Sequence, residues 1–235
     1  RPAYPMLIQG LRRLEYRGYD SAGVALVHEN GTLDVFKSKG KVADLERATQ
    51  GQDVSGTIGI AHTRWATHGE PNDANAHPHY SQSKTLAIIH NGIIENYNVL
   101  REMLRNHDYT FQSDTDTEVL VQLIEYIKQT NHCDLCTAVQ LALHEVVGAY
   151  AIAVIEKENP DLIVAARKSS PLVIGIRGNE RFLASDATPI IEHTKEVVYL
   201  NDEEVAVIRR NEPLQVVSLD NVVKPLHIKM LEMNI

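Results

Sequence analysis

The segment from Gly59 to Glu70, G-I-A-H-T-R-W-A-T-H-G-E, concentrates side chains that can bind a charged ligand. A short apolar stretch leads into Arg64 and Trp65, the single tryptophan of the chain. A guanidinium is a planar fork of donors that suits a carboxylate, and an adjacent indole keeps water away from such a pair. Thr67 and His68 add small donors. The segment predicts a carboxylate site, although a surface loop with Trp65 as a core plug and Arg64 paired to an internal acid would have the same composition.

The dipeptide Asn91-Gly92 is a second candidate, and it follows the apolar run Leu86 to Ile89. Asn-Gly is most often a type I′ hairpin turn. Here, however, a helical pattern with Asn96 as its cap starts soon after Ile94, which leaves only two or three residues for a return strand. A carboxamide N–H beside a glycine N–H can instead converge on one developing oxyanion. We therefore expect an oxyanion-binding role.

Two further polar clusters lie at the ends of predicted elements. The sequence S-D-T-D-T-E at 113–118 opens a strongly periodic helix, and Thr115 and Glu118 have the spacing of a capping box. The capping box leaves Asp116 unexplained, although the helix dipole favours a carboxylate in the first turn. In the loop L-E-Y-R-G-Y-D-S-A-G at 14–23, Arg17-Gly18 has the pattern of a helix C-cap.

These four motifs, in this order, closely resemble the glutaminase domains of the glucosamine-6-phosphate synthase family, the glutamine:fructose-6-phosphate aminotransferases. The likeness covers nearly the whole chain. Amidophosphoribosyltransferase and asparagine synthetase share the general plan of this class II glutamine amidotransferase domain but not A-H-T-R-W-A-T-H-G-E as a unit. The resemblance implies a four-layer αββα sandwich of the N-terminal-nucleophile hydrolase type.

The resemblance also implies roles for individual residues. Asn91 and Gly92 would form the oxyanion hole, and Arg17-Gly18 would lie beside the nucleophile rather than serve only as a cap. Arg64 and Asp116 would hold the α-carboxylate and α-ammonium groups of glutamine. The remaining substrate-binding residues would be Trp65, Thr67, His68 and His77. Of these, His68 and His77 would shape the wall and lid of the pocket.

The nucleophile of the resembled family is a cysteine at the mature N-terminus, whose own α-amino group is the general base. The printed chain begins at Arg1, and no cysteine precedes Cys133. We therefore expect residues 1–235 to be one glutaminase domain that lacks its first strand of perhaps ~10 residues and the catalytic cysteine, and to be inactive as printed. A non-catalytic amino-acid-binding module is the alternative. The sugar isomerase domain that uses the ammonia, to convert fructose 6-phosphate into glucosamine 6-phosphate, would lie outside this chain in a homodimeric full-length enzyme.

Histidines and cysteines suggest two other chemistries. Five histidines fall between residues 62 and 90, which could indicate a zinc hydrolase, but their spacing does not match a helical H-E-x-x-H. His62 and His90, on predicted strands, are expected to be hydrogen-bonded core histidines. Cys133 and Cys136 form a C-x-x-C pair with no second pair for zinc and no thioredoxin-like setting. The sequence therefore predicts no metal and no cofactor.

Length and charge set the remaining limits. A chain of 235 residues with 43% apolar residues can bury a large core, and the net charge of −8 disfavours nucleic acid as a partner. The longest apolar run, Gly148 to Ile155, is too short to span a membrane. Two unpaired thiols and an N-terminus without a signal peptide favour a cytoplasmic protein.

Periodicity predicts strands at both ends of the chain with helices between them, which is typical of an α+β fold of two sheets covered by helices. Asn30-Gly31 indicates a hairpin between the first two strands. The predicted helices are 4–15, 42–48, 96–105, 115–128 and 134–146. In 96–105 the inward residues would be Val99, Leu100, Met103 and Leu104. The predicted strands are 24–28, 32–37, 57–63, 86–90, 149–155, 162–167, 172–176, 182–185, 197–200 and 205–209, with a turn at 158–161.

Overall fold

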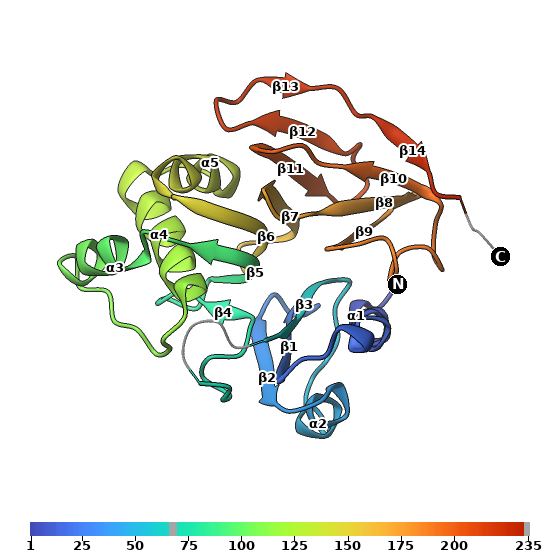
Figure 1. Cartoon of the computed structure of the whole chain (residues 1–235), viewed down its shortest axis with the longest axis horizontal. Helices are drawn as coiled ribbons and strands as arrows, with labels where there is room; N and C mark the ends of the chain where they lie inside the picture. Colours follow the sequence, from blue (N-terminus) through green and yellow to red (C-terminus); the bar gives the residue numbers. More distant parts are fainter. Residues whose placement is uncertain (66–69, 233–235) are drawn as a thin grey trace.

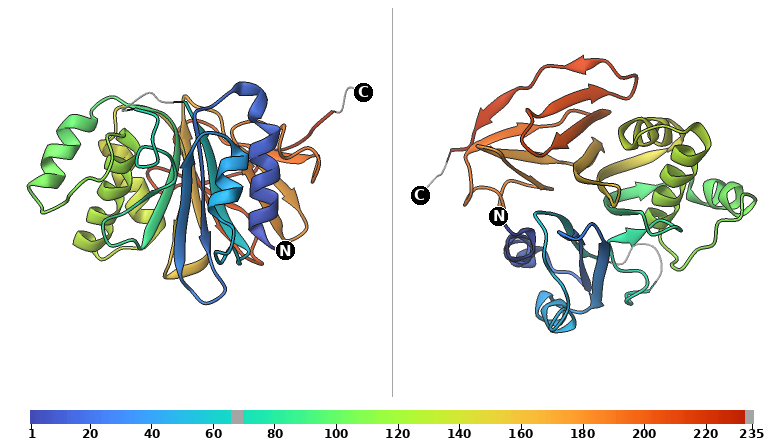
Figure 2. Two further views of the ribbon diagram at one scale, coloured as in Figure 1. Left: turned by 90° about the horizontal axis from the view of Figure 1, so that it is seen from below. Right: turned by 180° about the vertical axis from the view of Figure 1, so that it is seen from behind.

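Helices cover the outer faces of packed β-sheets in this structure, a computed structural model that describes residues 1–65 and 70–232 (Figure 1). Figure 2, in its left view, shows the sheets between two helical layers. The arrangement is therefore helix, sheet, sheet, helix. Among the described residues, no helix is long and apolar enough to cross a membrane.

The first sheet has the order β2-β1-β3 and is antiparallel throughout. Its strands are β1 (Ser21–Val27), β2 (Leu33–Lys39) and β3 (Ile58–Arg64). Two helices, α1 (Ala3–Arg13) and α2 (Val42–Ala48), cover its outer face, and a short 3₁₀ helix, η1 (Glu15–Arg17), follows α1. Val27 pairs with Leu33 in the register of β1 and β2, which confirms the predicted hairpin.

The second sheet has seven strands in the order β13-β12-β11-β7-β6-β5-β4. Its strands are β4 (His79–Tyr80), β5 (Leu86–Ile94), β6 (Gly148–Glu156), β7 (Asn159–Lys168), β11 (Glu204–Arg209), β12 (Gln215–Ser218) and β13 (Val223–Lys224). Its outer face is covered by α3 (Tyr97–Arg105), α4 (Asp116–Asn131) and α5 (Leu135–Glu145).

A third sheet, which the sequence pattern did not separate from the others, has the order β14-β10-β8-β9. Its strands are β8 (Val173–Arg177), β9 (Glu180–Ala184), β10 (Glu196–Tyr199) and β14 (Ile228–Met230). Ile174 and Val198 of this sheet join the same inner core as Ala25 of the first sheet and Ala153 of the second. The third sheet therefore belongs to the inner layers.

The second sheet has a different hydrophobic core on each of its two faces, and its strands alternate between them. In β6, Ile152 and Val154 contact the helix-side core, whereas Ala151 and Ala153 contact the core between the sheets. This alternation follows from the two-residue repeat of a strand. Small alanine side chains on the inner face let the sheets pack closely.

Several predicted details were wrong. Val99 is 71% exposed because it lies on the outer side of α3. The expected turn at 158–161 is shorter, since β7 already begins at Asn159. The strands β4, β12, β13 and β14 were not predicted. β4 and β13 have only two residues, β14 is exposed, and β12 has four residues of which the two adjacent valines are both buried, so none gives a strong alternating signal.

Candidate active site

A cavity of about 760 Å³ lies between β3 of the first sheet, β9 of the third sheet and the inner face of the second sheet. Among the described residues, β3 pairs only with β1, and β9 pairs only with β8. Both strands therefore turn an unpaired edge toward this cavity. The described residues predicted from the sequence as site residues all line it: Arg17, Gly18, Arg64, Trp65, His77, Asn91, Gly92 and Asp116.

Asn91 and Gly92 lie within β5 rather than in a hairpin turn. The ladder to β6 runs unbroken from Leu86 to Ile94, with Asn91 opposite Ala151 and Gly92 opposite Tyr150. Gly92 has a φ of 123°, and a Cβ atom there would lie 2.3 Å from the carbonyl oxygen of Ala149. Only glycine fits this backbone, so the strand can present the Asn91 carboxamide and the Gly92 backbone together at the cavity.

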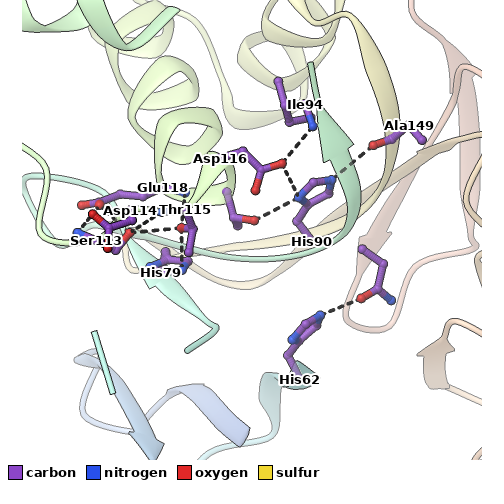
Figure 3. Close-up of polar contacts among 12 residues, drawn as sticks. His62, His79, His90, Ile94, Ser113, Asp114, Thr115, Asp116, Glu118 and Ala149 are labelled. Atoms are coloured by element: carbon purple, nitrogen blue, oxygen red, sulfur yellow. Dashed lines mark hydrogen bonds and ion pairs between the residues drawn. The ribbon is translucent and has the colours of Figure 1, made fainter. Parts of the chain in front are cut away.

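His62 contacts this pair directly. Its Nε2 atom lies 2.6 Å from Oδ1 of Asn91, and this contact is the dashed line that starts at the labelled His62 ring in Figure 3. The side chain is buried, and burial lowers the pKa of His62 to about 4, so the ring is neutral near pH 7. His62 is buried, as predicted, but it also lines the cavity and belongs to the site.

Among the arginine and acidic side chains that line the cavity, Arg64 and Asp116 are the buried ones, and both are 4% exposed. Arg64 ends β3, and Asp116 is the first residue of α4. Burial lowers the pKa of Arg64, and the carboxylates of Asp20 and Asp116 oppose this effect. The cavity therefore holds a buried cation from β3 and a buried anion from α4, an arrangement that complements the two charged ends of an α-amino acid.

Asp116 is held by neighbours on β5. Its Oδ2 atom accepts a 2.8 Å hydrogen bond from the Ile94 N–H and lies 4.0 Å from Nδ1 of His90 (Figure 3). His90 donates from Nε2 to the Ala149 carbonyl at 3.3 Å, and its Nδ1 accepts from the Thr117 hydroxyl at 2.9 Å. His90 is thus a hydrogen-bonded buried histidine, as predicted.

Only half of the predicted capping box forms at α4. The Thr115 hydroxyl accepts from the Glu118 N–H at 3.3 Å, as in a capping box. The Glu118 carboxylate, however, accepts from the N–H groups of Gln112 and Ser113 at 2.9 and 2.7 Å. Glu118 therefore fixes the loop before the helix, because that loop folds back over the first turn.

Three buried histidines form a row that starts at the cavity wall with His62 and His77 and continues to His79. The His62 and His77 rings stack with centroids 4.3 Å apart, and His77 meets His79 edge-on at 4.8 Å. Burial lowers the pKa of both His77 and His79 well below the ordinary value. Within 1–65 and 70–232, no group of three or more His, Cys, Asp or Glu side chains is placed to hold a metal ion.

The first loop and Trp65 close one side of the cavity. The Trp65 indole N–H donates to the Arg17 carbonyl at 3.2 Å, and a Cβ atom on Gly18 would lie 2.7 Å from the indole ring. Arg17 pairs with Asp186 and donates to the Ser185 hydroxyl at 3.0 Å. Trp65 is 61% exposed and is therefore not a core plug. Thr67 and His68 lie outside the described residues.

Cys133 and Cys136 are not among the residues that line the cavity; Cys133 lies just before α5, Cys136 lies in its first turn, and both are free. Burial raises the pKa of Cys136 to about 11 and also raises the pKa of Cys133. A thiol with a raised pKa holds little of the reactive thiolate at neutral pH. Neither thiol is suited to act as a nucleophile.

Known proteins share both the sequence and this architecture. Residues 21–222 match a family described as a glutamine amidotransferase domain. The whole chain is 65% identical to the glutamine–fructose-6-phosphate aminotransferase (isomerizing) of Bacteroides thetaiotaomicron. It is also 51% identical over 242 aligned residues to the protein of that name from Chlorobaculum tepidum. The chain spans 38% of the length of each of these relatives.

Solved structures agree on the fold. The glutamine phosphoribosylpyrophosphate amidotransferase from B. subtilis superposes with a TM-score of 0.74 at 27% identity, covering 92% of this chain and 46% of that one. An allosteric regulatory enzyme of purine biosynthesis gives a TM-score of 0.77 at 27% identity, covering 94% and 47%. The predicted α+β fold of the N-terminal-nucleophile hydrolase type is confirmed. The chain belongs to the glutamine amidotransferase domain family.

Proposed function

We propose that this domain hydrolyses glutamine to glutamate and ammonia. The observation that carries the proposal is that Asn91 and Gly92 face the same cavity as the buried charges of Arg64 and Asp116. The two charges suit the α-carboxylate and α-ammonium groups of glutamine. The carboxamide and backbone N–H groups of the dipeptide suit the oxygen of the side-chain amide once it becomes negative.

The reaction needs a nucleophile, which we assign to an N-terminal cysteine. Its thiolate attacks the amide carbon of glutamine, and the carbonyl oxygen becomes an oxyanion near Asn91 and Gly92. When the tetrahedral intermediate collapses, the C–N bond breaks and ammonia leaves with a proton delivered by the cysteine α-amino group. Water then cleaves the thioester, which releases glutamate and restores the thiol.

The unpaired edges of β3 and β9 offer a place for the strand that would carry this cysteine. Arg1 itself lines the cavity, and its Nε donates to Glu180 of β9 at 2.9 Å. A segment joined to Arg1 could run along β3 and satisfy the edge N–H and C=O groups. The apolar lining favours a strand with apolar side chains, and it includes Leu7, Ile60, Ala151, Ile163 and Leu183. Such a strand would place its first residue near Asn91 and Gly92.

The share of each relative that the chain covers suggests a wider role. In a longer protein like the aminotransferases it matches, the ammonia would pass to a sugar isomerase domain of the same polypeptide and aminate fructose 6-phosphate to glucosamine 6-phosphate. The full-length enzyme would be a homodimer. An assay for glucosamine 6-phosphate with glutamine as the nitrogen source tests this part of the proposal.

Two polypeptides test the glutaminase assignment. Residues 1–235 alone should bind glutamate in calorimetry without hydrolysing glutamine, whereas the same residues preceded by an N-terminal cysteine and an apolar strand should hydrolyse it. Replacing that cysteine by alanine should abolish turnover and keep binding. Arg64→Ala should weaken binding by about 2–5 kcal/mol, because it removes one partner of a buried charge pair. Hydrolysis by residues 1–235 alone would place the nucleophile elsewhere.

A further inference from the structure

The buried hydrogen bond between His62 and Asn91 indicates a role for His62 that the family resemblance did not assign to it. Its two partners come from different sheets, β3 and β5, and are 29 residues apart. The heavy-atom distance of 2.6 Å is short for a neutral N–H···O hydrogen bond. Oδ1 of Asn91 can only accept, so Nε2 of His62 must carry the proton that is donated.

We propose that His62 is a positioning residue that holds the Asn91 carboxamide with its oxygen turned inward and its NH₂ group turned to the cavity. A carboxamide has an acceptor end and a donor end on opposite sides of one carbon. Fixing the oxygen on His62 therefore aims the nitrogen away from His62. The opposite orientation would place Oδ1 where the oxyanion forms, and the two oxygens would repel each other.

The surroundings hold the His62 ring in place. One face stacks on His77 at a centroid distance of 4.3 Å and an interplanar angle of 19°. His77 contacts His79, whose Nε2 lies 3.0 Å from the Thr115 hydroxyl that caps α4. The row of rings therefore links the oxyanion amide on β5 to the helix end that begins with Asp116. A site built in this way is oriented before the substrate arrives, which is how oxyanion donors contribute most.

The protonation state agrees with this role. Burial is the main cause of the lowered pKa of His62. The hydrogen bond to Asn91 raises this pKa, the nearby charges of His90 and Arg64 lower it further, and His77 is a third titratable group in contact. A neutral imidazole carries one proton, and the 2.6 Å contact of Nε2 with the Asn91 oxygen, which can only accept, needs a donor on Nε2. The single proton therefore belongs on Nε2, where it can be donated to Asn91.

This inference rests on the proposed glutaminase function, and variants of the full-length protein test it through turnover. His62→Leu should lower kcat for glutamine hydrolysis by about ten- to a hundredfold and change KM by less than threefold, since it acts through a donor that matters only in the transition state. His62→Gln should recover most of the loss because its own NH₂ group can donate to Asn91. In an Asn91→Ala background, His62→Leu should cause no further loss, since the group that it positions is gone.

His28→Gln is the matched control. His28 is also a buried histidine next to the first sheet, but it bonds to Asp34 and the Ser55 carbonyl and does not line the cavity. It should retain the kcat of the parent. A His62→Leu variant with parental kcat, or one that loses the same factor with and without Asn91, would overturn the positioning role.

A measurement without turnover separates this inference from the proposed function. Long-range ¹H–¹⁵N NMR of ¹⁵N-histidine-labelled protein at pH 7 should assign His62 as the neutral tautomer with its proton on Nε2. A proton on Nδ1, or a charged ring, would refute the inference even in an active enzyme. If the parent protein is inactive, the glutaminase proposal is refuted. The NMR assignment of the His62 proton then still tests whether His62 donates to Asn91.

Discussion

Asp116 Oδ2 accepts a 2.8 Å hydrogen bond from the backbone N–H of Ile94, which ties the start of α4 to the end of the strand that carries Asn91 and Gly92. One carboxylate thus supports the strand and supplies a buried negative charge to the cavity. The two roles can be separated by a substitution that keeps the acceptor and removes the charge.

Asp116→Asn should therefore fold like the parent but bind glutamate more weakly, by about 1.5–3 kcal/mol for a lost hydrogen bond to a charged group. Calorimetry gives the affinity, and circular dichroism checks the fold. Asp114→Asn is the control, since Asp114 lies in the loop just before α4, accepts a hydrogen bond from the Asn75 side chain and does not line the cavity. Equal affinities for Asp116→Asn and the parent would refute the ammonium-binding role.

Gly92→Ala should disrupt the site through the backbone. The added methyl group would lie 2.3 Å from the Ala149 carbonyl oxygen at a φ of 123°, so β5 must shift. We expect a loss of about 1–3 kcal/mol in the free energy of unfolding, measured in urea, and a large loss of turnover. Gly31→Ala, at a φ of 82° with no atom within 4 Å, should lose about 1 kcal/mol and retain turnover. Full activity in Gly92→Ala would contradict the oxyanion assignment.

Local sequence patterns predicted the strands and helices that carry the site, but they did not predict the contacts between these elements. The strand before Arg64, the helix after Asp116 and the absence of a turn at Asn91-Gly92 all follow from nearby residues. The contact of His62 with Asn91 could not be predicted, because it depends on how two sheets pack. A buried strand histidine has the same local pattern whether it only fills the core or also lines a cavity.

The same limit explains the errors in the fold. Strand periodicity shows that residues 173–209 form strands, but it does not show which strands pair, so the third sheet was missed. Val99 fits the apolar pattern of α3 and is nevertheless exposed, because the helix turns that side away from the second sheet. Which strands pair, and which side of a helix faces the sheet, are decided by contacts between residues that are distant in sequence.

Trp65 should report ligand binding by fluorescence. It is the only tryptophan, it is largely exposed, and it adjoins Arg64 at the end of β3. A ligand carboxylate on Arg64 should change the water around the indole, so a glutamate titration should shift the emission and saturate. The response should vanish in Arg64→Ala. A saturating titration that leaves the parent spectrum unchanged would remove Trp65 from the site.

The buried histidines should make the domain less stable as the pH falls. Burial lowers the pKa of His62 to about 4, whereas a histidine in the unfolded chain has a pKa of ~6.5. Between these values the unfolded chain binds a proton that the folded domain excludes, so the free energy of unfolding falls by up to about 1.4 kcal/mol per pH unit for this histidine.

Urea unfolding of the parent and of His62→Gln between pH 7 and pH 4.5 measures this effect. In the variant, the free energy of unfolding should fall less steeply as the pH is lowered, by about the contribution of one bound proton. Identical slopes would mean that His62 titrates alike in the folded and unfolded states.

The most direct test of the central claim is the steady-state kinetics of glutamine hydrolysis by the full-length protein and its Asn91→Ala variant. An oxyanion donor acts on charge that develops only in the transition state, so the variant should lose roughly 10²–10³ in kcat while KM for glutamine stays within a few-fold. Unchanged kcat in Asn91→Ala would contradict the proposed mechanism.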